Sequence, residues 1–166
     1  KSQLVEALDH VKAWAVDGII LIVPVQGLSF AELEAACGRI PFVLVDTYQA
    51  PDTPSVVIDE AYGTRQLVEH LIQQGHRTFA EISGPLDWFN AQVRHQACLQ
   101  TLADHHLTPP FHVEANWTVS AGYRATKTLL AEKRPFSAVI AASDSMALGA
   151  MRALHEAGLC VPDDVS

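Results

Sequence analysis

Hydrophobic positions along the chain follow two alternating patterns, one typical of helices and the other typical of strands. Over residues 4–16 the apolar side chains recur at helical spacing, which predicts a helix with one buried face. A short continuous apolar run follows at residues 19–23 and predicts a buried strand. Residues 29–37 and 41–45 repeat this order, and the second helix begins with a Ser-x-x-Glu capping box. We therefore expect two successive pairs of helix and strand.

The remainder of the chain continues the alternation after a Pro-rich connection at residues 51–54. Strands are expected at residues 55–58, 78–82, 111–114 and 138–142, and helices at residues 61–72, 91–102, 120–131 and 145–157. Strands that alternate with helices in this way are joined by right-handed crossovers into parallel sheets, with helices on both faces. The pattern predicts an α/β fold built from doubly wound parallel sheets.

Composition allows a well-packed core but no membrane helix. Of the 166 residues, 49% are hydrophobic and 18% are charged, which suits one substantial core or two small linked ones. A membrane helix needs roughly 18 to 20 apolar residues in a row, whereas the longest run, residues 18–25, has the length of a strand and contains Pro24. We expect a soluble protein with no membrane partner. Because the chain begins at Lys1 without Met or signal sequence and ends in a turn-like segment, we expect a fragment.

Charge and cysteine content indicate whether this segment binds DNA and in which redox compartment it lies. The 11 Lys and Arg residues against 19 Asp and Glu residues give a formal net charge of -8, which repels phosphate backbones. This segment is therefore not expected to bind DNA by itself. The cysteines Cys37, Cys98 and Cys160 are odd in number, far apart and set among apolar neighbours. That pattern favours buried, reduced thiols in a cytoplasmic protein, with a disulfide or redox role as the alternative.

Polar and aromatic residues gather at one place in the predicted fold, directly after the strands. In an open parallel sheet the carboxyl ends of the strands share an edge, where loops and helix N-termini form ligand-binding crevices. The residues expected at this edge are Asp46, Asp59, Asp87, Trp88, Asn90, Arg94, Asn116, Trp117, Ser143 and Asp144. Carboxylates, an amide and a guanidinium can bind the hydroxyl groups of a neutral ligand, and an indole can cover its ring. We expect a small-molecule site at this edge.

Each of these residues also has a purely structural interpretation. Asp46 and Asp59 could be solvated turn formers, and Ser143 or Asp144 could cap the last helix. Arg94 could pair with a surface carboxylate, and the tryptophans could be ordinary packing residues. The hypothesis of a binding site depends on the shared location of these residues rather than on any one of them.

A series of short motifs occurs in the same order and spacing as in a known family. The motifs are Val16-Asp-Gly-Ile-Ile-Leu21, Ile40-Pro-Phe-Val-Leu-Val-Asp46, Gly75-His-Arg77, Ile82-Ser-Gly-Pro85, Arg134-Pro-Phe-Ser-Ala138, Ala142-Ser-Asp-Ser-Met-Ala-Leu-Gly-Ala150 and Val161-Pro-Asp-Asp-Val-Ser166. Together they resemble the effector-binding core of the lac repressor and galactose repressor family of bacterial transcriptional regulators. The resemblance covers essentially the whole chain.

The resemblance implies a periplasmic-binding-protein-like fold, in which a sugar or nucleobase effector lies between two α/β lobes. Residues 1–58 would form part of the N-terminal lobe and residues 59–166 the C-terminal lobe. The DNA-binding headpiece and the first strands of the N-terminal lobe would lie outside this sequence, so we expect the first lobe to be incomplete. Effector binding would switch the affinity of a homodimer for operator DNA, which the missing headpiece would contact.

The family's ligand-binding positions can be carried over by match. Asp46 and Arg94 would hydrogen-bond the effector, Trp117 would stack on its ring, and loss of Arg94 should abolish the effector response without unfolding the domain. The other matched positions are Asp59, where the chain crosses between lobes, and Trp88 and Asn90, in the loop that shapes the pocket. The family usually has Asn-Asp before the last helix, but here the pair is Ser143-Asp144. A serine lacks the paired donor and acceptor of an amide, which leaves the identity of the effector open.

The helix over residues 145–157 resembles one that contributes to dimerisation in the family. Its apolar residues, among them Met146, Leu148 and Met151, surround most of the helix, which is more than one core-facing stripe needs. We expect these three residues to lie in a dimer interface. The helix would then be buried on two sides.

Two other classes of protein are alternatives to a regulator. A periplasmic sugar-binding protein of a transport system shares the fold, but it acts mainly as a monomer and would leave the outer face of the last helix polar. An enzyme is disfavoured because the sequence has no Gly-x-Ser-x-Gly elbow, no phosphate-binding Gly-rich loop and no His-x-x-x-His helix. We expect structural or surface roles for His76 and for the pair His105-His106. We expect no cofactor and no metal.

Overall fold

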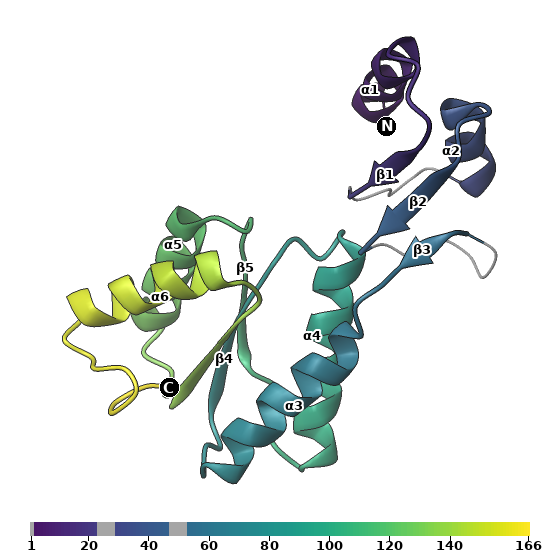
Figure 1. The fold of residues 1–166 in the computed structure, drawn as a ribbon. Coiled ribbons are helices and arrows are strands. Elements are labelled where there is room, and N and C mark those ends of the chain that lie inside the picture. The colour runs from purple at the N-terminus through teal and green to yellow at the C-terminus, as the bar shows by residue number, and fades with distance from the viewer. Residues whose placement is uncertain (1, 23–28, 47–52) are drawn as a thin grey trace. The chain divides into compact units, whose positions relative to one another are not determined.

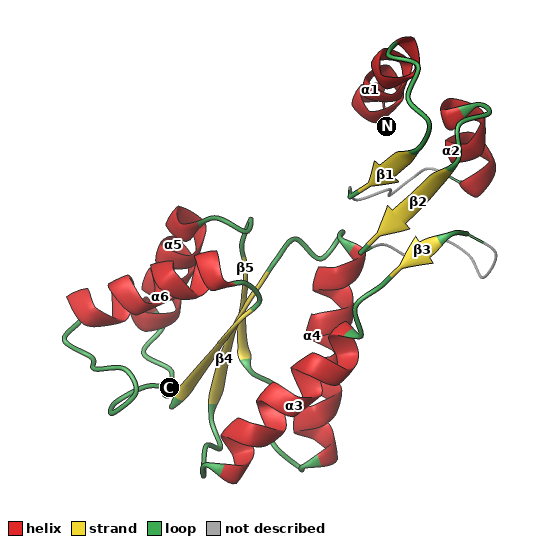
Figure 2. Ribbon diagram, viewed as in Figure 1, coloured by secondary structure: helices red, strands yellow, loops and turns green. Residues whose placement is uncertain are grey.

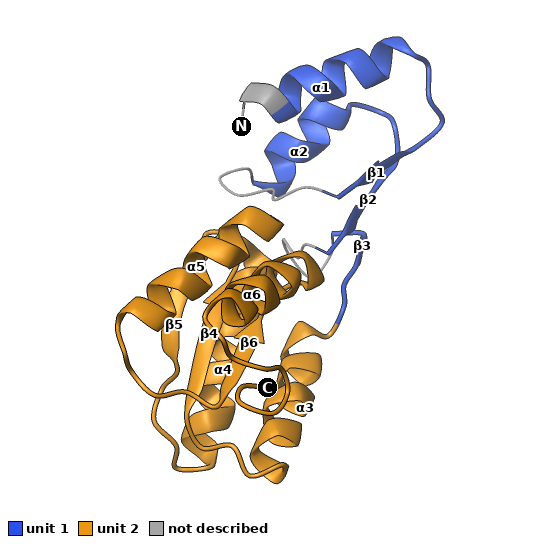
Figure 3. Ribbon diagram, turned by 90° about the vertical axis from the view of Figure 1, so that its left-hand side faces the viewer, with its two compact units in different colours: residues 1–58 blue, residues 59–166 orange. Residues whose placement is uncertain are grey.

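Helices alternate with parallel strands through both halves of the chain. The structure, a computed structural model, describes residues 2–22, 29–46 and 53–166. Within these residues all the strand pairs are parallel, which confirms the predicted α/β class (Figure 2). The chain divides into two compact units, unit 1 at Lys1–Ile58 and unit 2 at Asp59–Ser166 (Figure 3).

Unit 1 contains a three-stranded sheet in the order β1-β2-β3. Its elements are α1 (Ser2–Ala13), β1 (Ile19–Leu21), α2 (Phe30–Cys37), β2 (Phe42–Val45) and β3 (Ser55–Val56). The predicted capping box of α2 is confirmed, because Ser29 Oγ accepts a hydrogen bond from the Glu32 backbone N–H and Glu32 accepts one from the Ser29 backbone N–H. The last residue predicted for the first strand, Val23, lies outside the described residues, as do Pro24 and residues 51–52.

The sheet of unit 1 buries one of its two faces. Its core residues are Leu8, Ile19, Leu21, Leu33, Cys37 and Leu44. On the opposite face, Ile20 is 69% exposed and Val56 is 61% exposed. A doubly wound sheet would cover both faces with helices, whereas the described residues of unit 1 leave this face exposed.

Unit 2 contains a second three-stranded sheet, in the order β5-β4-β6. Its elements are α3 (Glu60–Gln73), β4 (Phe79–Ser83), α4 (Phe89–Asp104), β5 (Phe111–Glu114), α5 (Val119–Ala131), β6 (Ala138–Ala141) and α6 (Asp144–Glu156). Helices α3 and α4 pack together on one side of the sheet, and α5 and α6 pack together on the other (Figure 1). The central strand β4 is consequently covered on both faces.

Alternate residues of β4 enter two separate hydrophobic clusters. Phe79 packs with Cys98 and Leu102, whereas Ala80 and Ile82 belong to the cluster on the side of α5 and α6. This alternation follows from the two-residue period of a strand. The only polar residues of β4, Glu81 and Ser83, share the face of Phe79, and both are buried.

The structure also tests the predictions on cysteines and membrane helices. All three cysteines are free, and Cys37 and Cys98 are buried as predicted. The prediction of burial is wrong for Cys160, which is exposed because it begins the turn that follows α6. Within the described ranges, each helix is too short or too polar to cross a bilayer.

Candidate functional site

The carboxyl ends of β4, β5 and β6 lie at one edge of the sheet of unit 2, and two tryptophans meet there. Trp88 precedes α4 in the loop after β4, and Trp117 follows β5. The centroids of their rings are 5.8 Å apart, with an angle of 55° between the planes. Parallel pairing of the strands brings these two loops together, as the pattern of the sequence predicted.

Arg94 joins a third loop to this aromatic pair. Its guanidinium carbon lies 5.9 Å from the centroid of the Trp117 ring, which is a cation–π distance. The same guanidinium donates to the backbone carbonyl of Ala142, directly after β6. Side chains or backbone atoms that follow all three strands therefore meet around Arg94.

A carboxylate holds Arg94 in this position. Glu60, at the start of α3, accepts two hydrogen bonds from Arg94, each 2.7 Å long. The Glu60 side chain is 11% exposed, so this is a largely buried ion pair rather than the surface pair considered as the structural alternative. The two parallel hydrogen bonds fix the plane of the guanidinium.

Trp117 occupies an unusual environment. Its backbone φ is +69°, in the left-handed region, and its indole lies against Gly84 so closely that a Cβ there would be 2.1 Å from the ring. Among the described residues, its indole N–H is buried without a hydrogen-bond partner. An unmatched buried donor costs free energy that an acceptor on a ligand could recover.

Several other predicted site residues have structural partners close by in the sequence. The Ser143 hydroxyl caps α6 by accepting from the Met146 backbone N–H at 3.3 Å, and the Asp59 carboxylate caps α3 by accepting from the Tyr62 backbone N–H at 2.9 Å. Asn90 Oδ1 accepts from the Ala91 backbone N–H at 2.8 Å. The Ser143 contact agrees with the capping interpretation, and a ligand role for Asp59, Asn90 and Ser143 stays a prediction.

The remaining predicted site residues are more exposed or belong to the other unit. Asp144 lies in the first turn of α6 and is exposed, as are Asp87 and Asn116. Asp46 belongs to unit 1, where it follows β2 with a backbone φ of +60° and donates its N–H to the Val56 carbonyl. A ligand-binding role for Asp46 therefore stays a prediction.

One of the three predicted interface residues lies in the core instead. Met146 is 0% exposed and packs in the core of unit 2, so its side chain is not available to a second subunit. Leu148 and Met151 are 59% and 52% exposed on α6. The apolar residues around α6 thus divide between a core face and an outer face.

Sequence reasoning missed two residues that shape this edge. Glu60 carries no local signal, because its partner Arg94 is 34 residues away. Gly84 was quoted in the Ile82-Ser-Gly-Pro85 motif, but its role is to make room for Trp117, which belongs to another loop.

Known proteins resemble this chain in sequence and in fold. A family model described as a periplasmic binding protein-like domain matches residues 68–166. The lactose operon repressor of Escherichia coli K12 is 33% identical over 160 residues, which are 96% of this chain and 44% of that protein. The transcriptional repressor PurR of Klebsiella pneumoniae strain 342 is 31% identical over 155 residues, which are 91% of this chain and 46% of that protein.

The fold comparison agrees with the sequence comparison. A dimeric lac repressor with an 11-residue C-terminal deletion matches with a TM-score of 0.87 and 32% identity, over 98% of this chain and 60% of that one. The chain thus spans less than half of the two curated relatives. The resemblance inferred from the motifs is confirmed, since the matched relatives include lac repressor-type transcriptional repressors, and the chain belongs to the periplasmic-binding-protein-like domain family.

Proposed function

We propose that this chain is the effector-binding core of a transcriptional repressor and that it takes a small neutral polar molecule, most simply a sugar, at the edge formed by Trp88, Arg94 and Trp117. The observation that carries the proposal is the meeting of two indoles from separate loops with the guanidinium of Arg94 from α4, together with a buried indole N–H that has no partner among the described residues. A sugar offers a flat apolar ring face and hydroxyl acceptors, which suit these groups.

The names of related proteins support this class of ligand. One matched structure is a sugar-binding transcriptional regulator of the LacI family from Escherichia coli, and another is the lac repressor bound to ONPG. In this chain Asp46 and Asp59 would supply further hydrogen bonds, and Ser143 and Asp144 would line the same site. A nucleobase-like effector is the alternative within this proposal, as the resemblance to PurR suggests.

The proposed mechanism is a switch driven by binding. An effector that favours one arrangement of two lobes changes how a homodimer presents its DNA-reading segments to an operator. With a net charge of -8, this chain would leave DNA contact to a headpiece outside it. We place the protein in the cytoplasm, without catalytic activity and without a membrane partner.

A ligand screen tests the proposal directly. The full-length protein would be heated with individual sugars and nucleobases, because a ligand that binds only the folded state raises the melting temperature. We expect at least one sugar to do so. If none of the sugars or nucleobases shifts the transition, the proposed function is wrong.

Replacement of Trp117 by Leu should weaken binding of the sugar selected in that screen. Removing a central aromatic contact costs about 2 kcal/mol, or roughly a thirtyfold loss of affinity, to be measured by isothermal titration calorimetry. Trp14→Leu is the matched control, because Trp14 is 76% exposed in unit 1 and should not affect affinity. Equal affinity of both variants and the parent would remove Trp117 from the site.

Leu148 and Met151 should support the homodimer through the outer face of α6. Replacement of both by Glu would place charges in an apolar interface, and we expect sedimentation equilibrium to show a monomer. Leu67→Glu is the control, because Leu67 is 45% exposed on α3. A parent protein that is itself monomeric would instead favour a transport-type sugar-binding protein.

A further inference from the structure

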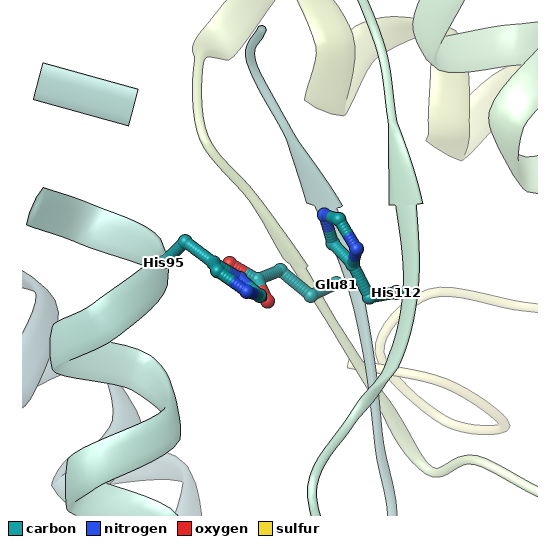
Figure 4. A group of neighbouring side chains, drawn as sticks. All are labelled: Glu81, His95 and His112. Atoms are coloured by element: carbon teal, nitrogen blue, oxygen red, sulfur yellow. The ribbon is translucent and has the colours of Figure 1, made fainter. Parts of the chain in front are cut away.

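A glutamate and two histidines form a cluster in unit 2 that the proposed function does not use. Glu81 lies on the central strand β4, His112 is its register partner on β5, and His95 reaches the same place from α4 (Figure 4). One donor atom from each of the three residues lies within 4.8 Å of the others. Three elements thus direct carboxylate and imidazole groups to a common point.

Burial of the Glu81 carboxylate costs free energy unless another group balances its charge. Its side chain is 4% exposed, and its face of β4 also carries Phe79, which packs against Cys98. A carboxylate in such surroundings needs a cationic partner.

Hydrogen bonds define which nitrogen of His112 can act as a ligand. The Ser83 hydroxyl donates to the Gly84 carbonyl at 2.9 Å. Since a hydroxyl has one proton, Ser83 must accept in its 2.7 Å contact with His112 Nε2, so that nitrogen carries hydrogen. In the neutral ring the lone pair then lies on Nδ1.

His95 already lies close to the Glu81 carboxylate. Its Nδ1 is 2.8 Å from Glu81 Oε2, so a metal ion that takes the place of the shared proton would bind both atoms. The rings of His95 and His112 have centroids 4.5 Å apart, so the two available nitrogens belong to adjacent imidazoles.

We propose that Glu81, His95 and His112 bind a divalent transition metal of the zinc class. Two imidazole nitrogens and a carboxylate oxygen are ligands that Zn²⁺ prefers, whereas Mg²⁺ and Ca²⁺ take oxygen ligands. Ser83 holds His112 through its second ring nitrogen, as partners of metal-bound histidines commonly do. The metal balances the buried carboxylate and joins α4 to the sheet.

The geometry specifies how the site closes. Metal bonds of roughly 2.0 to 2.2 Å require ligand atoms closer together than the 4.8 Å limit of this cluster. Glu81 and His95 already lie 2.8 Å apart, so binding must draw His112 toward them. His112 is half-buried on β5, which is an edge strand of the described sheet. That edge gives a metal ion and a fourth ligand, water, a way in.

Metal titration of the whole chain tests the site. After treatment with a chelator, the protein would be titrated with Zn²⁺ in the calorimeter, and X-ray absorption at the zinc edge would identify the ligands. We expect one equivalent to bind with two imidazoles in the first coordination sphere. Saturation at about 100 times the dissociation constant should raise the melting temperature by roughly 5 to 10 °C.

Variants separate this cluster from other histidines. Ser83→Ala should weaken Zn²⁺ binding about tenfold, and His112→Gln by about a hundredfold, because they remove an orienting partner and a ligand. His105→Gln with His106→Gln is the control, since both residues are exposed at the end of α4. If the control variant loses Zn²⁺ binding while His112→Gln keeps it, the proposal is overturned.

The absorption measurement on the parent chain keeps the test decisive even if His112→Gln does not fold. A zinc shell without two imidazoles, or no stoichiometric binding, would contradict the site. Either result would leave the proposed effector site untouched, because Trp88, Arg94 and Trp117 are not among these ligands.

Discussion

Arg94→Ala is expected to abolish sugar binding and also to destabilise unit 2. The substitution removes the guanidinium from Trp117 and from the Ala142 carbonyl, and it leaves the Glu60 carboxylate, 11% exposed, without its charged partner. Loss of one member of a buried ion pair costs roughly 3 kcal/mol. Urea denaturation would measure this cost, and calorimetry with the sugar selected in the screen would measure binding.

The double variant Arg94→Ala with Glu60→Ala separates the two effects. Removing both charges should recover part of the lost stability, because no uncompensated carboxylate remains. Sugar binding should stay absent, since the guanidinium is still missing. If Arg94→Ala bound the sugar as tightly as the parent chain, the assignment of the site at this edge would fail.

Gly149→Ala should have the largest effect on stability alone. A Cβ at Gly149 in α6 would lie 2.0 Å from the Val119 carbonyl oxygen and 2.6 Å from the Tyr123 backbone nitrogen, both in α5. Backbone atoms cannot move aside as a flexible side chain can, so the helices must separate and open the core around Met146. We expect a loss of about 3 kcal/mol in the free energy of unfolding, at the upper end of overpacking.

Gly63→Ala is the matched control for this substitution. Gly63 also lies within a helix, α3, but a Cβ there would meet nothing within 4 Å. Alanine should therefore stabilise the protein by about 0.5 to 1 kcal/mol through its higher helix propensity. Equal urea midpoints for the two variants would show that α5 and α6 do not depend on this close approach.

The apolar pattern of α6 does not by itself show which face of the helix packs against the core. The apolar circumference of α6 correctly indicated two apolar faces, but it assigned Met146 to the wrong one. The contact of Gly149 with α5 determines which side of α6 faces the core, and Met146 lies on that side at 0% exposure. A helical repeat alone does not say which apolar face meets the protein's own core.

The candidate site was predictable only in part. The positions of Trp88 and Trp117 after parallel strands were enough to expect them at one edge, because parallel pairing brings strand ends together. The partner of Arg94 was not predictable, since Glu60 comes from a different helix and depends on how α3 packs against α4. The cap of Ser143 on α6 was expected as an alternative from local sequence, whereas Asp59 was expected as a turn former and instead caps α3.

Features that depend on neighbouring residues could be predicted from the amino-acid sequence: the alternation of helices and strands, the capping box at Ser29, and the parallel α/β class. Local hydrogen bonds and apolar periodicity act over a few residues, so they can be read along the chain. Only the tertiary structure decided the pairing of Glu60 with Arg94 and the meeting of Glu81, His95 and His112, because strand register and helix packing bring together residues far apart in sequence.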